Sequence, residues 1–308
     1  MKGSPFLSDP EVLAVRTNFR AMLERLPSPL AEVGHRVLDR ISSPNWSLEW
    51  FLPRWLGDAF GLQPDVSRAL VLANVYGLAY IRLQDDLVDG EIEQTSWKPA
   101  ILLAGALYHQ AIRQYISLFE WSSSFWDYFE LFMAQWTRAT LSSNEPPIAD
   151  FRSCEEANLV RLAERGAPLK ICCAAACLLA GREDTIPTLT AAVDHLLMGA
   201  VLLDHVKDWA DDLAAGRYNA FVAYASSKPQ EPHQQEANRL AVLEEIYLGE
   251  AARPYFDLVY KHIQMAIEMA QGVNCPGLTQ YLLSFKSQAL TFGERLADDA
   301  KVRLRAAA

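Results

Sequence analysis

Apolar residues recur at helical spacing along most of this chain, and no segment of strand length alternates between apolar and polar residues. Prolines, glycines and short polar runs separate the periodic stretches, as expected where helices end. The pattern predicts an all-α protein. Helices are expected at residues 10–26, 30–41, 65–89, 99–119, 122–141, 150–165, 167–180, 187–215, 236–270 and 277–304, and an aromatic-rich stretch covers 46–60.

Domain organisation follows from the same pattern. The sequence has no internal repeat and no linker long enough to separate two domains. Its most polar connecting stretch, 226–235, is predicted to be a mobile loop. With 308 residues, 51% of them hydrophobic, the chain can bury a large core. We therefore expect residues 1–308 to form a single all-α domain.

The expected helix 65–89 ends in three aspartates, Asp85, Asp86 and Asp89. On a helix, Asp85 and Asp89 lie about 40° apart on one face, and apolar residues such as Val75 lead to them along it. Two carboxylates one turn apart repel each other by roughly 0.2–0.5 kcal/mol when exposed. A divalent cation would offset that repulsion, and Mg²⁺ is usually held by one or two carboxylates together with substrate phosphates.

A second acidic stretch lies in the expected helix 187–215. Asp204, Asp208 and Asp212 follow one another at four-residue intervals and therefore share one helix face, with Asp211 beside them. Two such helices facing each other would form an apolar pocket with a mouth of carboxylates. The alternative is that both stretches are unrelated acidic faces in contact with solvent.

The charge balance narrows the choice of partners. Asp and Glu number 38 against 28 Lys and Arg, which gives a net charge of -10, and the sequence pI is about 5.1. No run of Lys or Arg is present, so the sequence argues against nucleic acid as a partner. An acidic protein can still bind an anionic substrate if metal ions lie between the two.

No segment has the length of a membrane span. The longest apolar runs, around 171–180 and 196–203, are shorter than the roughly 20 residues that a transmembrane helix needs. Residues 1–10 lack the basic and apolar regions of a signal peptide. We therefore expect no transmembrane segment and a cytoplasmic location.

Together, the two aspartate stretches resemble the metal-binding motifs of the class I isoprenoid synthases. This superfamily comprises trans-prenyltransferases, squalene and phytoene synthases, and class I terpene synthases. The likeness covers most of the chain in helix number, helix order and motif separation. It implies an antiparallel helical bundle around a central apolar cavity, with the two motifs facing each other across the mouth. It also implies three Mg²⁺ ions that bind the diphosphate of an allylic isoprenoid.

The resemblance implies a metal-binding role for six aspartates, of which the first and third are also expected to be catalytic. The six are Asp85, Asp86, Asp89, Asp204, Asp208 and Asp212. In the first motif, Asp86 matches a supporting acid. The second motif of terpene synthases has Asn or Asp, then Ser or Thr, then Glu. The all-aspartate form here departs from it and is closer to the D-x-x-x-D of squalene-type enzymes.

Basic residues near the motifs are candidates for binding diphosphate. Arg217, followed by Tyr218, comes where prenyltransferases have a Gly-Lys that contacts diphosphate, and it is the first candidate for a catalytic cation. Lys207 lies within the second motif. Arg161 and Arg165 resemble the diphosphate-sensing arginine of bacterial terpene synthases. Each of the four basic residues is also compatible with an ordinary surface charge.

The residues after the first motif indicate how many substrates the site binds. Chain-elongating relatives bind isopentenyl diphosphate through a Gly-Lys-x-x-Arg near the N-terminus and an Arg-Arg-Gly after the first motif. Here Asp89 is followed by Gly90 and Glu91, and no arginine comes before Arg113. We therefore expect a class I terpene synthase, most similar to non-standard bacterial ones. It would ionise farnesyl, geranylgeranyl or geranylfarnesyl diphosphate and release a cyclic or rearranged terpene and diphosphate.

Two alternatives stay open. The D-x-x-x-D spacing also fits a squalene- or phytoene-type enzyme, or another prenyltransferase, that joins prenyl diphosphates. A non-catalytic relative would bind a prenyl lipid or support a partner subunit. Magnesium-dependent release of diphosphate separates the enzymes from the binding protein, and the carbon number of the product separates joining from cyclisation. Many members of the superfamily are homodimers, and nothing in the sequence tests a homodimer here.

Overall fold

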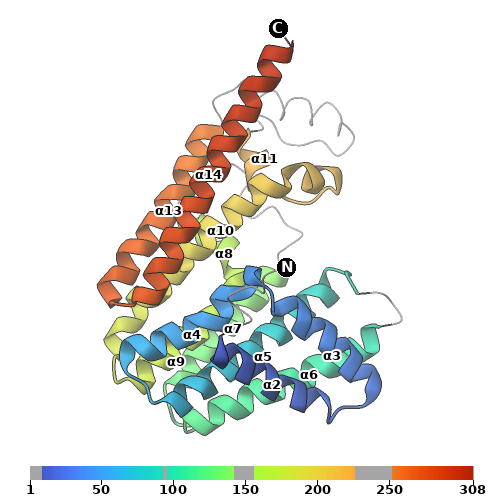
Figure 1. The fold of residues 1–308 in the computed structure, drawn as a ribbon, viewed down its shortest axis with the longest axis vertical. Helices are drawn as coiled ribbons and strands as arrows, with labels where there is room; N and C mark the ends of the chain where they lie inside the picture. Colours follow the sequence, from blue (N-terminus) through green and yellow to red (C-terminus); the bar gives the residue numbers. More distant parts are fainter. Residues whose placement is uncertain (1–8, 93–95, 142–155, 226–251, 308) are drawn as a thin grey trace. The chain divides into compact units, whose positions relative to one another are not determined.

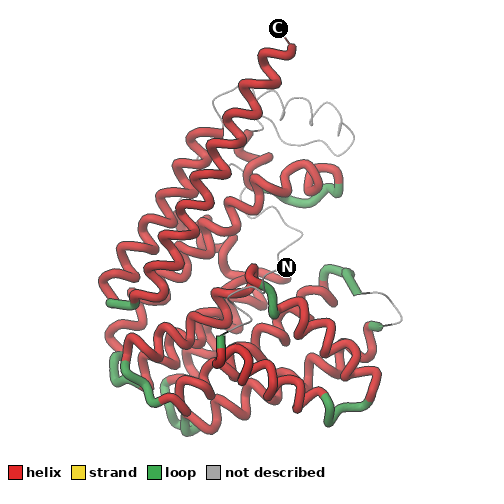
Figure 2. Tube along the Cα trace, in the orientation of Figure 1, coloured by secondary structure: helices red, strands yellow, loops and turns green. Residues whose placement is uncertain are grey.

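A computed structural model describes residues 9–92, 96–141, 156–225 and 252–307. Every regular element in these residues is a helix (Figure 2), which confirms the predicted all-α fold class. Figure 1 shows the order of the helices along the chain. The predicted mobile loop at 226–235 and the first part of the predicted helix 236–270 lie outside the described residues.

Apart from α8 and α13, whose predicted starts lie outside the described residues, the helices begin and end within a few residues of their predicted bounds. In the first half of the chain they are α2 (Pro10–Leu23), α3 (Ser28–Ile41), α4 (Ser47–Phe60), α5 (Pro64–Val88), α6 (Trp97–Leu118) and α7 (Phe125–Leu141). In the second half they are α8 (Glu156–Ala163), α9 (Leu169–Leu179), α10 (Ile186–Ala214), α11 (Ala220–Ala225), α13 (Ala252–Val273) and α14 (Pro276–Ala307). Three 3-10 turns connect some of them: η1 (Pro44–Trp46), η2 (Glu164–Gly166) and η3 (Glu183–Thr185). The short helix α11 was not predicted.

Capping residues, prolines and glycines determine where several helices begin and end. Pro10 and Pro64 occupy the first positions of α2 and α5, where a missing N–H costs nothing. The Asp9 side chain caps α2 by accepting hydrogen bonds from two backbone N–H groups at 2.9 and 3.3 Å. Gly61 ends α4 and Gly216 follows α10, both in the left-handed conformation, with φ of 70° and 67°.

The helices divide into two compact units. Unit 1 comprises Met1–Ala134, Pro168–Thr190 and Asn274–Leu278, and unit 2 comprises Gln135–Ala167, Ala191–Val273 and Thr279–Ala308. Helices α7, α10 and α14 therefore each contribute residues to both units. That residues 1–308 form a single domain stays a prediction.

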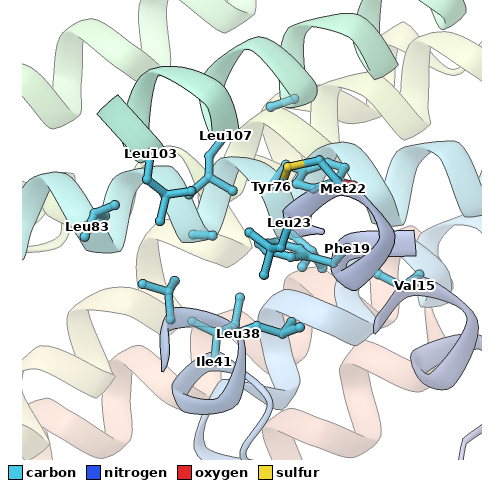
Figure 3. Close-up of a cluster of buried hydrophobic side chains, with 14 of the residues drawn as sticks. Val15, Phe19, Met22, Leu23, Leu38, Ile41, Tyr76, Leu83, Leu103 and Leu107 are labelled. Atoms are coloured by element: carbon cyan, nitrogen blue, oxygen red, sulfur yellow. The ribbon is translucent and has the colours of Figure 1, made fainter. Parts of the chain in front are cut away.

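Unit 1 has an apolar core built from α2, α3, α4, α5 and α6 (Figure 3). The rings of Phe19 on α2 and Tyr76 on α5 lie 4.9 Å apart, and both side chains are buried. Val71 and Val75, on the apolar stripe that leads toward the first aspartate motif, belong to this core. Their burial holds α5 in place and so positions the acidic end of that helix.

In unit 2, α13 and α14 run as an antiparallel pair (Figure 1), and α13 also packs against α10. The Lys286 side chain of α14 donates a hydrogen bond to Gln264 of α13 at 2.8 Å. Helices α10 and α13 approach closely at Gly199, where a Cβ atom would lie 2.8 Å from Cγ1 of Ile263. Only glycine fits that approach without movement of the neighbouring side chain.

Helix α10 also has the length and apolar composition of a membrane span, as part of the stretch Glu183–Ala214. More than half of its most apolar window, 56%, is buried inside the protein. The core helix of a soluble protein meets the same criteria, so this feature is weak evidence for a membrane. The predicted absence of a transmembrane segment and the cytoplasmic location stay predictions.

Candidate active site

The first aspartate motif occupies the last turn of α5. Asp85 is half-buried and Asp89, the residue that follows the helix, is exposed. The backbone N–H of Asp89 donates to the carbonyl of Asp85 at 2.8 Å, so the helical spacing continues through both residues. The two candidate ligands therefore share a helix face, as their spacing predicts.

Asp86 is buried and makes two ion pairs. Its Oδ2 accepts a hydrogen bond from Nη1 of Arg40 at 2.8 Å, and its Oδ1 lies 2.9 Å from Nη2 of Arg82. Glu91 lies 3.3 Å from the same Arg82 nitrogen. Burial raises the pKa of Asp86 above its ordinary value, and the two guanidinium groups offset only part of that shift. These contacts tie α3 and the end of α5 together, which suits a supporting acid.

The two arginines were not predicted to be neighbours of the first motif. Arg82 lies one helical turn before Asp86, so the i, i+4 spacing was a usable signal. Arg40 is 46 positions away on α3, and no local pattern connects it to Asp86. The first motif therefore has basic side chains beside it, although none comes soon after it in the sequence.

The second motif lies on the last turns of α10. Asp204 is exposed and accepts a hydrogen bond from Nζ of Lys207 at 2.8 Å. Asp208, one turn later, is exposed as well. Partial burial raises the pKa of Asp208, and the charges of Asp204 and Asp212 raise it further. A bound cation would relieve this repulsion between neighbouring carboxylates.

Asp212 has different surroundings, because its carboxylate is largely buried. Its Oδ2 accepts a hydrogen bond from Nδ2 of Asn219 at 2.8 Å, and its Oδ1 accepts one from Nε of Arg217 at 2.9 Å. The Oδ1 atom of Asn219 accepts hydrogen bonds from two backbone N–H groups at the start of α11. Asp212 thereby connects the end of α10 to the next helix.

His205 completes this connection. Its Nδ1 accepts a hydrogen bond from the backbone N–H of Ala220 at 3.2 Å, and its ring lies edge-on to that of Tyr218. Burial lowers the pKa of His205, although the nearby carboxylates of Asp212 and Asp204 oppose that shift. The native state therefore favours a neutral imidazole that carries its proton on Nε2.

The predicted diphosphate-binding residues all lie in unit 2. Lys207 is on α10, Arg217 and Tyr218 follow the end of that helix, and the structure pairs Arg217 with Asp212. Arg161 is exposed on α8, and Arg165 lies in η2. Gly166, the next residue, approaches Leu197 of α10 so closely that a Cβ atom would lie 2.6 Å from Cδ2. That Arg161, Arg165, Lys207, Arg217 and Tyr218 bind diphosphate stays a prediction.

Lys170 is a further candidate that sequence analysis missed. It lies in the first turn of α9 and is only 2% exposed, with Nζ 4.9 Å from the centre of the Phe132 ring. A lysine inside the apolar run of α9 is itself a signal, because lysine side chains are rarely fully buried. The residue places an amino group beside an aromatic ring in the interior of unit 1.

The acidic residues are suited to Mg²⁺ in their chemistry. All six candidates offer carboxylate oxygens, the hard ligands that Mg²⁺, Ca²⁺ and Mn²⁺ prefer. Within the described residues, no group of three or more His, Cys, Asp or Glu side chains is gathered closely enough to hold a metal ion. A set of one or two carboxylates on each helix requires phosphate oxygens and water to complete the coordination. The metal-binding roles stay predictions.

Solved structures of other proteins share the fold of this chain. The sequence matches no protein-family model and no curated protein. The structure is similar to a geranylgeranyl pyrophosphate synthetase from the archaeon Geoglobus acetivorans, with a TM-score of 0.66 and 15% identity over 92% of this chain and 97% of that one. It is also similar to a geranylgeranyl pyrophosphate synthase from Lactobacillus brevis ATCC 367, with a TM-score of 0.69 and 14% identity over 94% and 99% of the two chains.

A third similar structure is a polyprenyl synthase from Caulobacter crescentus CB15 complexed with calcium and isoprenyl diphosphate. Its TM-score is 0.65 and its identity 13%, over 92% of this chain and 95% of that one. Identities this low show a shared fold and nothing more. That fold is the one that the two aspartate motifs predict.

Proposed function

We propose that this chain, which has the all-α isoprenoid synthase fold, is an enzyme that acts on a prenyl diphosphate. The observation that supports the proposal is that this fold carries carboxylates at four-residue spacing at the ends of two helices. Asp85 and Asp89 are at the end of α5, and Asp204 and Asp208 are in the last turns of α10. Partial burial and the carboxylates of Asp204 and Asp212 raise the pKa of Asp208, and a bound cation would lower it.

The carboxylates divide into two roles in this proposal. Asp85, Asp89, Asp204 and Asp208 would hold Mg²⁺, whose positive charge would let the diphosphate leave from the prenyl carbon. Asp86 would hold the end of α5 in place through its ion pairs and would not face the substrate. The apolar residues that precede Asp85 on the same face of α5 would keep water away from the cationic hydrocarbon.

Within this activity, transfer of the prenyl group to a second substrate is better supported than cyclisation. The similar structures are named as geranylgeranyl or polyprenyl synthases, and one of them is complexed with isoprenyl diphosphate. The expectation of a cyclase relied on the lack of arginines soon after Asp89. Arg40, from α3, and Arg82, one turn before Asp86 on α5, both contact the first motif, which weakens that argument.

Cyclisation of a single prenyl diphosphate is the second candidate. Arg40 and Arg82 are both engaged with Asp86, and both also lie near Glu91. Binding a second diphosphate through these arginines would therefore require them to exchange partners. That cost favours an enzyme with one diphosphate substrate.

The experiment that tests the proposal supplies geranyl, farnesyl, geranylgeranyl and geranylfarnesyl diphosphate, each with and without isopentenyl diphosphate. Reactions contain Mg²⁺ or EDTA, and both released diphosphate and extracted products are measured. A longer prenyl diphosphate formed only with isopentenyl diphosphate indicates transfer. A hydrocarbon or alcohol from one substrate indicates cyclisation, and a product with twice the carbon number indicates joining. A complete lack of magnesium-dependent diphosphate release would overturn the proposal.

A further inference from the structure

Asn219 is a buried amide side chain, 3% exposed, in the corner between α10 and α11. Its Nδ2 atom donates hydrogen bonds to the backbone carbonyl of His205 at 2.9 Å and to Oδ2 of Asp212 at 2.8 Å. Its Oδ1 atom accepts hydrogen bonds from the backbone N–H groups of Phe221 and Val222 at 3.0 and 3.1 Å. These bonds use both N–H donors and both lone pairs of the amide, so the side chain is fixed in place.

The hydrogen bonds of Asn219 hold this corner against the second aspartate motif. His205 and Asp212 are about two helical turns apart and therefore lie on the same face of α10. Asp208 lies between them along the helix, about 60° round from His205 at 100° per residue. The corner, which carries Arg217, is therefore held against the two turns of α10 that contain Asp208.

Arg217 binds Asp212 through only one of its three guanidinium nitrogens. Its Nε atom donates to Oδ1 of Asp212 at 2.9 Å, whereas Nη1 and Nη2 have no hydrogen-bond partner among the described residues. The arginine side chain is 62% exposed. Parallel N–H groups of an arginine are suited to bidentate binding of a phosphate. Arg217 is therefore held at one side of its guanidinium group and still has donors for an anion.

The carboxylate of Asp212 connects the buried amide to the exposed arginine. Asn219 binds one of its oxygens and Arg217 binds the other. We propose that Asn219 is a positioning residue, which acts through Asp212 to hold Arg217 in the orientation in which its terminal N–H groups bind diphosphate. This inference rests on the proposed function. It makes Asp212 the counter-ion of Arg217 and not a ligand of Mg²⁺.

Positioning of this kind strengthens the binding of an anion by reducing the conformational entropy lost on binding. A long, exposed arginine side chain loses rotamer freedom when it binds a ligand. The bond from Asp212 to Nε removes part of that freedom before the ligand arrives, provided that the carboxylate is itself fixed. Without the amide of Asn219, the carboxylate and the arginine would move together, and the affinity for diphosphate would fall.

The test is a double-mutant cycle that measures the binding of inorganic diphosphate by calorimetry, with and without Mg²⁺. Asn219→Ser lacks the amide donors but keeps a hydroxyl that can cap the start of α11. With Arg217 present, this substitution should weaken binding in Mg²⁺ about fivefold. In an Arg217→Ala background it should weaken binding less than about twofold, because the residue through which Asn219 acts is missing.

A purely structural role of Asn219 gives a different result, since a disturbed corner would weaken binding by the same factor in both backgrounds. The matched control is Tyr255→Phe, which removes a buried hydrogen bond from the Tyr255 hydroxyl to the carbonyl of Leu202 on α10. It should bind diphosphate as the wild-type protein does. Circular dichroism checks that each variant is folded. If Asn219→Ser does not fold, Asp212→Ala takes its place in the cycle, with the same expected difference between the backgrounds.

Two failures can be distinguished. If the wild-type protein binds diphosphate in a magnesium-dependent way and Asn219→Ser has no effect, or the same effect in both backgrounds, the role of Asn219 is overturned and the proposed function stands. Wild-type affinity in Arg217→Ala also overturns that role. If the wild-type protein does not bind diphosphate in Mg²⁺, the proposed function and the inference that rests on it both fail.

Discussion

Two aspartates of the second motif, one helical turn apart, should respond in opposite ways to the same substitution. Asp212 is largely buried and hydrogen-bonded, whereas Asp208 is exposed beside other carboxylates. Asp212→Ala is expected to destabilise the protein in the absence of metal. Asp208→Ala is expected to leave it equally stable or slightly more stable, while removing a candidate metal ligand.

The contacts of Asp212 set the magnitude of its effect. Its hydrogen bond to the buried Asn219 involves a charged acceptor, for which removal costs about 1.5–3 kcal/mol. Its ion pair with Arg217 contributes less, about 0–1 kcal/mol, because the arginine side chain is 62% exposed. Asp212→Ala should therefore lower the free energy of unfolding by about 2–3 kcal/mol.

The sign for Asp208 follows from its raised pKa. A carboxyl whose pKa is higher in the folded state favours folding when protonated. This contribution is fully present below the ordinary pKa of 3.8 and is lost as pH rises through the higher pKa of the folded state. At neutral pH the negative charge of Asp208 therefore lowers the free energy of unfolding. Each like-charged i, i+4 pair that the substitution removes should raise the free energy of unfolding by roughly 0.2–0.5 kcal/mol.

Urea unfolding in EDTA, followed by circular dichroism, measures both effects at neutral pH. The same titration with Mg²⁺ and inorganic diphosphate should stabilise the wild-type protein and should stabilise Asp208→Ala much less. An Asp212→Ala protein as stable as wild type would refute the proposed connection between α10 and α11. An Asp208→Ala protein as unstable as Asp212→Ala would refute the electrostatic argument.

Two further predictions concern unit 2. Because the pKa of His205 is lowered from its ordinary value of 6.5, the neutral imidazole stabilises the folded state above that pH. The protein should therefore lose stability as pH falls below 6.5. In a plot of melting temperature against pH, His205→Asn, which does not titrate, should show a smaller decrease over this range. Gly199→Ala should destabilise the protein by about 1–3 kcal/mol, since the new Cβ would overlap Ile263. The control, Gly105→Ala on the exposed face of α6, meets no atom within 4 Å and should stabilise the protein by about 0.5–1 kcal/mol in the same urea titration. Equal effects of the two glycine substitutions would contradict the close approach of α10 and α13.

Most of the fold could be predicted because its signals are local. The proline that begins α5 and the glycine after α10 lie within one residue of the predicted helix boundaries. The helices between such boundary residues are long enough to show a helical period in the sequence. Helix α11 could not be predicted in this way. Its six residues are too few to show a helical period, and its start depends on a cap from Asn219.

In the candidate site, only features that follow from the geometry of a single helix could be predicted. The shared face of Asp85 and Asp89 follows from the 3.6-residue period alone. The pairing of Asp86 with Arg40 depends on the packing of α3 against the end of α5, which no local pattern encodes. Arg217 is expected to bind an anionic substrate, which stays a prediction, and the structure pairs it with Asp212. A carboxylate and a phosphate attract an arginine for the same electrostatic reason, so the sequence alone could not choose between them.

The proposed function requires that the carboxylates at the end of α5 hold Mg²⁺ for the release of diphosphate from a prenyl substrate. The most direct test compares magnesium-dependent diphosphate release by the wild-type protein and by Asp85→Ala, with circular dichroism to show that both are folded. We expect release by the wild-type protein in Mg²⁺, no release in EDTA, and a loss of at least about 100-fold in Asp85→Ala. Release at the wild-type rate by a folded Asp85→Ala protein would contradict this requirement.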